Sequence, residues 1–104
     1  MVEFTVTSLE SDGATIVAVA GEIDLATAPE LRTALLAAEG DVTVDLAGVS
    51  FMDSSGLGAL VAAQKHTVGS GHRFVVRNET ELVERTMKLT GVYEFFHPNG
   101  IAPE

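Results

Sequence analysis

A single continuous stretch, VTVDLAGVSFMDSSGLG (residues 42–58), passes from one hydrophobic pattern to another. Apolar and polar residues alternate over residues 42–46, which predicts a short strand with one buried face. Apolar residues then recur at intervals of three and four from Leu57 onward, which predicts a helix over residues 55–68. The residues between the two patterns are predicted to form a polar loop that includes Asp53.

Similar changes of pattern extend in both directions from this stretch. Two alternating segments flank Asp12-Gly13, a pair that favours a tight turn, so they are predicted to form a hairpin. A helix is predicted to begin at the N-cap Thr27, with Pro29 in its first turn and Glu30 placed as in a capping box. The predicted elements outside the central stretch are strands over 2–8 and 15–19, a helix between 27 and 40, a strand over 73–77, a helix over 79–89 that buries Leu82, Val83 and Met87, and a strand over 92–96.

The resulting order of elements is ββαβαβαβ. Strands separated by single helices predict parallel crossover connections, so the expected fold is α/β, a mixed sheet with helices packed on it. A chain of 104 residues has room for one hydrophobic core, so residues 1–104 are predicted to be a single domain. Its core covers residues 2–97, residues 98–104 form a polar tail, and fraying is expected to begin at His97.

The composition excludes several classes of function. Fifteen acidic residues against six basic ones give a formal charge of −9, which argues against binding to nucleic acid or to anionic lipid. The absence of cysteine excludes disulfides, thiolate metal sites and a cysteine nucleophile. No apolar run is long enough to span a bilayer, and the N-terminal segment lacks a signal-peptide pattern. We therefore expect a cytoplasmic protein without direct membrane contact.

Catalytic and ligand-binding motifs are weak. The three histidines (His66, His72 and His97) lack metal-ligand spacing and are interpreted as isolated. The nucleophile elbow of hydrolases is absent, and the pair Gly56 and Gly58 lacks the third glycine of a dinucleotide fingerprint, so Gly58 is interpreted as allowing the helix close to the sheet.

Three aspartates near predicted strand ends leave a cation site open, although solvated or capping roles are favoured over Mg²⁺ binding. They are Asp24, Asp45 and Asp53.

The start of the central helix allows two interpretations. Aspartate and serine satisfy the free N–H groups at a helix N-terminus, so capping by Asp53, Ser54 and Ser55 is favoured from the residues alone. The same position tolerates a phosphate, because the helix N-terminus carries partial positive charge. A phosphorylated serine there would change the surface charge without melting its helix.

The central stretch closely resembles the core motif of STAS domains, and more narrowly that of bacterial anti-sigma factor antagonists. Residues 21–28, GEIDLATA, resemble the second motif of that family, and residues 89–92, LTGV, resemble its third. The resemblance covers about residues 2–97. It implies a small mixed sheet of four to five strands with helices packed on one side. Many relatives continue into a further helix, which we expect to be short or missing here.

The resemblance implies a binding function, not an enzymatic one. In the family, the unphosphorylated antagonist binds an anti-sigma factor, commonly also a serine kinase, and frees a sigma factor. The kinase phosphorylates the first serine after the motif aspartate, here Ser54, and a PP2C-type phosphatase removes the phosphate. No cofactor or metal is expected, and a homodimer stays open. The expected partner-binding residues are Asp24, Asp53, Ser54, Ser55, Gly56 and Leu57.

Other functions stay open as alternatives. STAS domains also occur as subunits of membrane transport or lipid-trafficking assemblies, and some bind small ligands. An enzyme would need a catalytic constellation that the sequence does not show.

Overall fold

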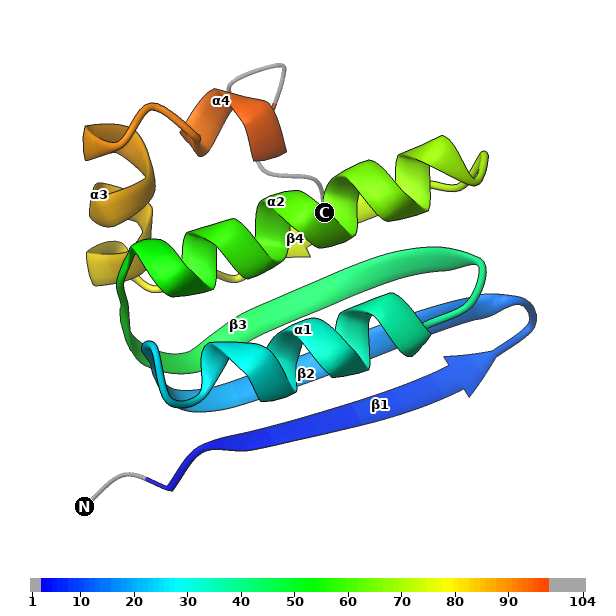
Figure 1. Ribbon diagram of the computed structural model, residues 1–104, viewed down its shortest axis with the longest axis horizontal. Coiled ribbons are helices and arrows are strands. Elements are labelled where there is room, and N and C mark those ends of the chain that lie inside the picture. The colour runs from blue at the N-terminus through cyan, green and yellow to red at the C-terminus, as the bar shows by residue number, and fades with distance from the viewer. Residues whose placement is uncertain (1–2, 98–104) are drawn as a thin grey trace.

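A four-stranded sheet with helices packed against it forms the protein, and the computed structural model describes residues 3–97 (Figure 1). The strands lie in the order β1-β2-β3-β4, with an antiparallel β1–β2 pair and parallel β2–β3 and β3–β4 pairs. This arrangement confirms the predicted α/β class and mixed sheet. The elements are β1 (Thr5–Ser11), β2 (Ala14–Ile23), α1 (Ala28–Ala37), β3 (Asp41–Met52), α2 (Ser54–Gly69), β4 (Phe74–Arg77), α3 (Glu81–Leu89) and α4 (Tyr93–Phe96).

The predicted hairpin is present, but β1 begins three residues later than predicted and β2 is longer than predicted. Asp12 and Gly13 connect β1 to β2 with positive φ angles of 53° and 77°. Two such residues form the tight turn whose twist matches that of the flanking strands. Ser11 therefore pairs directly with Ala14, and the register continues to the pair of Thr5 with Ala20.

β3 is longer than predicted because it bulges twice. Its register with β2 shifts between Ala18 and Ala20 and again between Gly21 and Glu22. Each extra residue bends the strand and changes which side chains face the core. The prediction of a loop directly after residue 46 is wrong. The alternation of apolar and polar residues ends there, but β3 continues to pair with β2 as far as Met52. The buried residues of β3 are spaced first by two and then by three positions: Val42, Val44, Leu46, Val49 and Met52.

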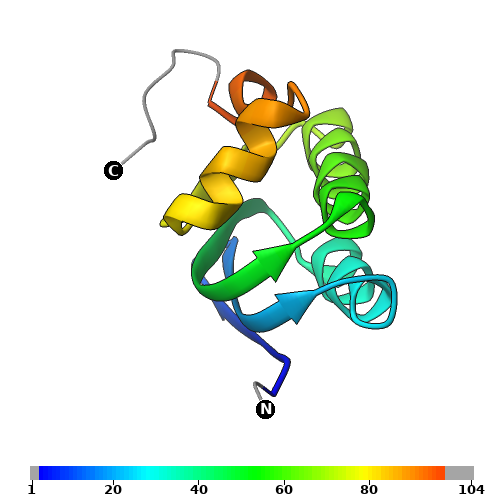
Figure 2. The same cartoon turned by 90° about the vertical axis from the view of Figure 1, so that its left-hand side faces the viewer.

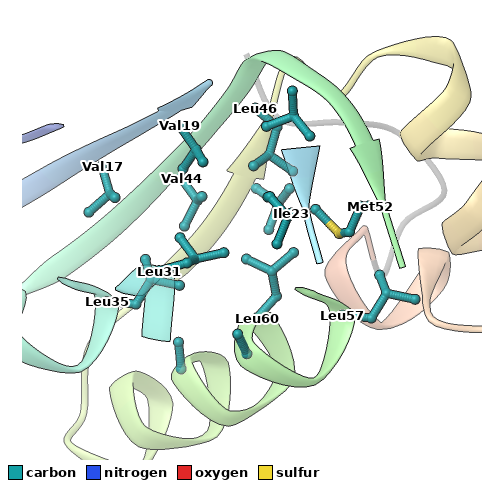
Figure 3. Close-up of a cluster of buried hydrophobic side chains, with 14 of the residues drawn as sticks. Val17, Val19, Ile23, Leu31, Leu35, Val44, Leu46, Met52, Leu57 and Leu60 are labelled. Atoms are coloured by element: carbon teal, nitrogen blue, oxygen red, sulfur yellow. The ribbon is translucent and has the colours of Figure 1, made fainter. Parts of the chain in front are cut away.

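Most of the core lies between the sheet and the two helices α1 and α2, which lie together on one face of it (Figure 2). Val83 and Met87 of α3 and Phe96 of α4 belong to the same buried cluster. Val17 of β2 and Val44 of β3 point toward Leu31 and Leu35 of α1 and Leu60 of α2 (Figure 3). All five side chains are completely buried. Burial of each stabilises the fold by about 1.5–3 kcal/mol relative to exposure. Ile23 and Met52, the last residues of β2 and β3, lie against Gly56 in the first turn of α2 and hold the start of that helix at the strand ends.

The end of the described chain differs from the prediction. Residues 92–96 do not form a strand, and Tyr93–Phe96 form the short helix α4 instead. Gly91, with a φ of +81°, turns the chain after α3, and the Val92 N–H donates to the Met87 carbonyl at 3.0 Å. A short and largely apolar run such as VYEFF fits a strand or a helix equally well, and the turn that ends α3 selects the helix.

Two predictions about individual residues in this region are also wrong. Leu82 is 47% exposed, whereas Val83 and Met87 are buried as predicted. His97 is completely buried and contacts the Glu79 carboxylate, so fraying does not begin there. The predicted tail, residues 98–104, lies outside the described residues. Within residues 3–97, no helix is long and apolar enough to cross a membrane.

Candidate functional site

Asp53 caps the N-terminus of α2. Its backbone is extended, and its carboxylate Oδ1 accepts hydrogen bonds from the Ser55 N–H at 2.9 Å and from the Ser55 hydroxyl. Its carbonyl oxygen accepts from the N–H groups of Gly56 and Leu57, at 3.1 and 3.2 Å. The predicted capping function of Asp53 is therefore present.

The same contacts keep Asp53 charged. The hydrogen bond from the Ser55 hydroxyl is the largest cause that lowers the pKa of the Asp53 carboxyl below its ordinary value, and backbone N–H groups add to it against partial desolvation. Hydrogen bonds to the charged form of a carboxyl stabilise that form. The helix therefore begins beside a fixed negative charge at neutral pH.

The two adjacent serines lie in different environments. The Ser55 hydroxyl is half-buried and donates to Asp53. Ser54, the first residue of α2, is exposed, and its hydroxyl forms no hydrogen bond with any residue between 3 and 97. Of these two serines, Ser54 is the one whose hydroxyl is both accessible and without a protein partner among residues 3–97.

Asp24 and Asp53 leave neighbouring strands at the same edge of the sheet. Ile23 at the end of β2 pairs with Met52 at the end of β3, and the Asp53 N–H donates to the Ile23 carbonyl at 3.2 Å. Asp24 and Asp53 are both among the expected partner-binding residues, and the strand register brings the two residues together.

The Asp24 side chain organises the turn into α1. Its Oδ1 accepts hydrogen bonds from the N–H groups of Ala26 and Thr27, at 3.0 and 3.1 Å. The Thr27 hydroxyl donates to the Glu22 carbonyl and accepts from the Asp24 N–H, so it is not free to cap the helix. The predicted capping box of Thr27 with Glu30 is wrong for this reason.

The two residues after the serines are buried. Gly56 lies against the sheet, where an added Cβ would be 2.6 Å from Cγ2 of Ile23 and 2.7 Å from Cγ of Met52. Leu57 is 5% exposed and belongs to the core. Both residues therefore hold the start of α2 against the sheet and the core. The assignment of close helix–sheet approach to Gly58 is wrong, because Gly58 is exposed and a Cβ there would meet nothing within 4 Å.

A shallow groove that was not predicted from the sequence lies beside this helix start. It has a volume of about 250 Å³ and lies between α1 and α2. The sequence signal that could have indicated it is a second glycine, Gly58, inside a predicted helix, where glycine is unfavourable. The lining residues include Leu25, Pro29, Arg32, Ser55, Gly58 and Ala59.

The remaining candidates stay separate from this site. Asp45 accepts hydrogen bonds from the Ala47 N–H and the Asn78 side chain, within the sheet region. Among residues 3–97, no three carboxylate or histidine side chains are grouped to hold a metal ion. His66 and His72 line a different pocket, at the C-terminal end of α2. The chemistry that the site offers is an exposed hydroxyl at a helix N-terminus.

Comparison with known proteins gives consistent results. A family described as "Mlab, STAS domain" matches residues 7–97. The anti-sigma-B factor antagonist of Staphylococcus epidermidis is 38% identical over 87 residues, which cover 80% of this chain and 81% of that protein. The structure of an anti-sigma factor antagonist from Mycobacterium paratuberculosis matches with a TM-score of 0.79 and 33% identity, over 90% of this chain and 83% of that one.

A third similarity concerns the fold alone. The Bacillus cell fate determinant SpoIIAA in its phosphorylated form matches with a TM-score of 0.69 and 17% identity, over 90% of this chain and 87% of that one. The two relatives above 30% identity are named anti-sigma factor antagonists, which agrees with the prediction of a non-enzymatic domain.

Proposed function

Because the chain belongs to the STAS domain family, we propose that it is an anti-sigma factor antagonist whose binding is switched by phosphorylation of Ser54. The relatives named as anti-sigma factor antagonists support the first part of the proposal. The observation that carries the second part is the exposed Ser54 hydroxyl at the start of α2, beside a serine whose own hydroxyl is already bound to Asp53.

A phosphate on Ser54 would change the surface more than the fold. It adds a charge of about −1.5 to −2 at pH 7, and the N-terminus of α2 stabilises that charge within the chain. A partner that covers Ser54 would bury the phosphate close to the charged Asp53 and to Asp24. Desolvation and repulsion then weaken the complex, with about tenfold lower affinity for each 1.4 kcal/mol lost.

The proposed cycle needs two further proteins. An anti-sigma factor with serine kinase activity binds the unphosphorylated chain and then modifies Ser54. A PP2C-type phosphatase restores the free hydroxyl. These steps place the chain in the cytoplasm, together with the sigma factor that is released.

The first test is phosphorylation by the purified anti-sigma factor kinases of the source genome, with ATP and Mg²⁺. We expect mass spectrometry to show one phosphoryl group on Ser54, absent in Ser54→Ala. Ser55→Ala is the matched control and should still be modified at Ser54. Phosphate on Ser55 in the wild-type chain would contradict the assignment of the residue.

The second test measures the affinity for the same anti-sigma factors. Ser54→Asp should bind at least about tenfold more weakly than the wild-type chain, because it adds charge inside the interface. Equal affinities would contradict the switch. Binding to a membrane transport complex, with no anti-sigma factor bound, would favour the alternative function of a transport or lipid-trafficking subunit.

A further inference from the structure

The groove between α1 and α2 continues the surface that carries Ser54. Figure 1 shows the two helices side by side with their N-termini at the same end, where β2 and β3 finish. Ser55, the neighbour of Ser54 in the first turn of α2, lines the groove directly. A protein that covers Ser54 therefore extends into the groove with little further displacement.

Gly58 keeps the groove open although the fold does not need it. An interior helical glycine is unfavourable, because it loses more backbone freedom on folding than alanine does. Gly56 has a packing reason, since Ile23 and Met52 leave no room for a side chain, whereas nothing lies within 4 Å of a Cβ at Gly58. A residue that lowers helix stability without a packing reason, such as Gly58, is typical of a functional surface.

Besides Ser55 and Gly58, the groove is lined by apolar residues and by one cationic residue. Leu25 stands at its rim with 80% of its surface exposed, beside Pro29. Arg32 also lines the groove, and no carboxylate among residues 3–97 lies within ion-pair distance of it. In a chain with fifteen acidic and six basic residues, a cation in this place selects a negatively charged group from outside.

We propose that this groove receives an apolar side chain of the anti-sigma factor, with a neighbouring carboxylate of that protein paired to Arg32. The inference rests on the proposed function and adds the chemistry of the partner. The groove volume of about 250 Å³ is below the 300–1,000 Å³ of typical small-molecule pockets, so a single protein side chain is the better match. Desolvation of an arginine is a feature of interface hot spots, and burial of the exposed Leu25 removes further apolar surface from water.

The experiment fills the groove and measures binding to the anti-sigma factor that retains the wild-type chain. Gly58→Leu places a leucine side chain in the groove. Because leucine is a better helix former than glycine, the Tm of this variant should be at least that of the wild type. Gly69→Leu is the matched control, because Gly69 lies at the other end of α2 and is equally open. Arg32→Glu tests the proposed ion pair with the anti-sigma factor. Because Arg32 is exposed, the substitution should leave the fold intact.

We expect Gly58→Leu and Arg32→Glu each to bind at least about tenfold more weakly than the wild-type chain, and Gly69→Leu to bind as the wild type does. The loss in an Arg32→Gln variant should shrink as salt is raised, because salt screens the wild-type ion pair.

Two outcomes would overturn the inference in different ways. Unchanged affinity of Gly58→Leu and Arg32→Glu, together with weak binding of Ser54→Asp, would remove the groove from the interface but retain the Ser54 switch. Failure of the wild-type chain to bind any anti-sigma factor of the source genome would overturn the proposed function as well.

Discussion

Replacement of Gly56 by alanine should destabilise the protein, although alanine is the better helix former. The new methyl group would lie 2.6 Å from Cγ2 of Ile23 and 2.7 Å from Cγ of Met52, where an ordinary contact is at least 3.4 Å. Ile23 and Met52 are 0% and 2% exposed, so neither can move into solvent. The start of α2 must shift, or the core must repack.

The expected magnitude follows from two opposing effects. Overpacking of a buried site costs about 1–3 kcal/mol, and alanine recovers up to about 1 kcal/mol of helix propensity. Gly56→Ala should therefore lower the free energy of unfolding by about 1–2 kcal/mol, which corresponds to a fall in Tm of about 5–15 °C. Urea denaturation followed by circular dichroism measures the change.

Gly58→Ala supplies the control, two residues further along the same helix. Its Cβ meets nothing within 4 Å, so it should raise the free energy of unfolding by about 0.5–1 kcal/mol. If the two substitutions changed the free energy of unfolding equally, or if Gly56→Ala raised it, the conclusion that Gly56 but not Gly58 is closely packed would be refuted.

Two further predictions concern hydrogen-bonded carboxyl groups. Glu79→Ala leaves the buried His97 imidazole without its hydrogen-bond partner, so the free energy of unfolding should fall by about 1–3 kcal/mol in urea denaturation. A loss below about 1 kcal/mol would show that the pair contributes little. Asp53→Asn retains a capping oxygen but removes a carboxylate whose pKa is lowered in the fold, chiefly by Ser55. A lowered folded-state pKa contributes stability above the ordinary value of about 3.9 and loses it as the pH falls further. The difference in urea midpoint between wild type and Asp53→Asn should therefore be constant between about pH 5 and 7 and shrink below about pH 4. A difference that grows on acidification would contradict this.

The candidate site was only partly predictable from local sequence. Capping by Asp53 follows from an aspartate directly before a helical pattern, and its oxygen reaches an N–H two residues away. The different environments of Ser54 and Ser55 do not follow, because both serines satisfy the same capping preference. Only the folded helix start shows which hydroxyl is bound to the aspartate and which is exposed.

Predictions failed where the outcome depended on segments far apart in the chain. The two glycines after the serines look equivalent in sequence, yet only Gly56 faces the buried side chains at the ends of β2 and β3. The two bulges of β3 interrupt the alternation on which a strand prediction depends, although its pairing with β2 continues to Met52. His97 looked like the start of a polar tail because its partner, Glu79, precedes it by eighteen residues.

The sequence by itself determined the features that arise within a few residues: the turn at Asp12-Gly13, the order of most strands and helices, and the cap of α2 at Asp53. These depend on backbone dihedral preferences and short-range hydrogen bonds, which each residue carries with it. The tertiary structure decided the approach of Asp24 to Asp53 and the groove beside α2. Strand register and side-chain packing join residues distant in the chain, and no local pattern encodes those contacts.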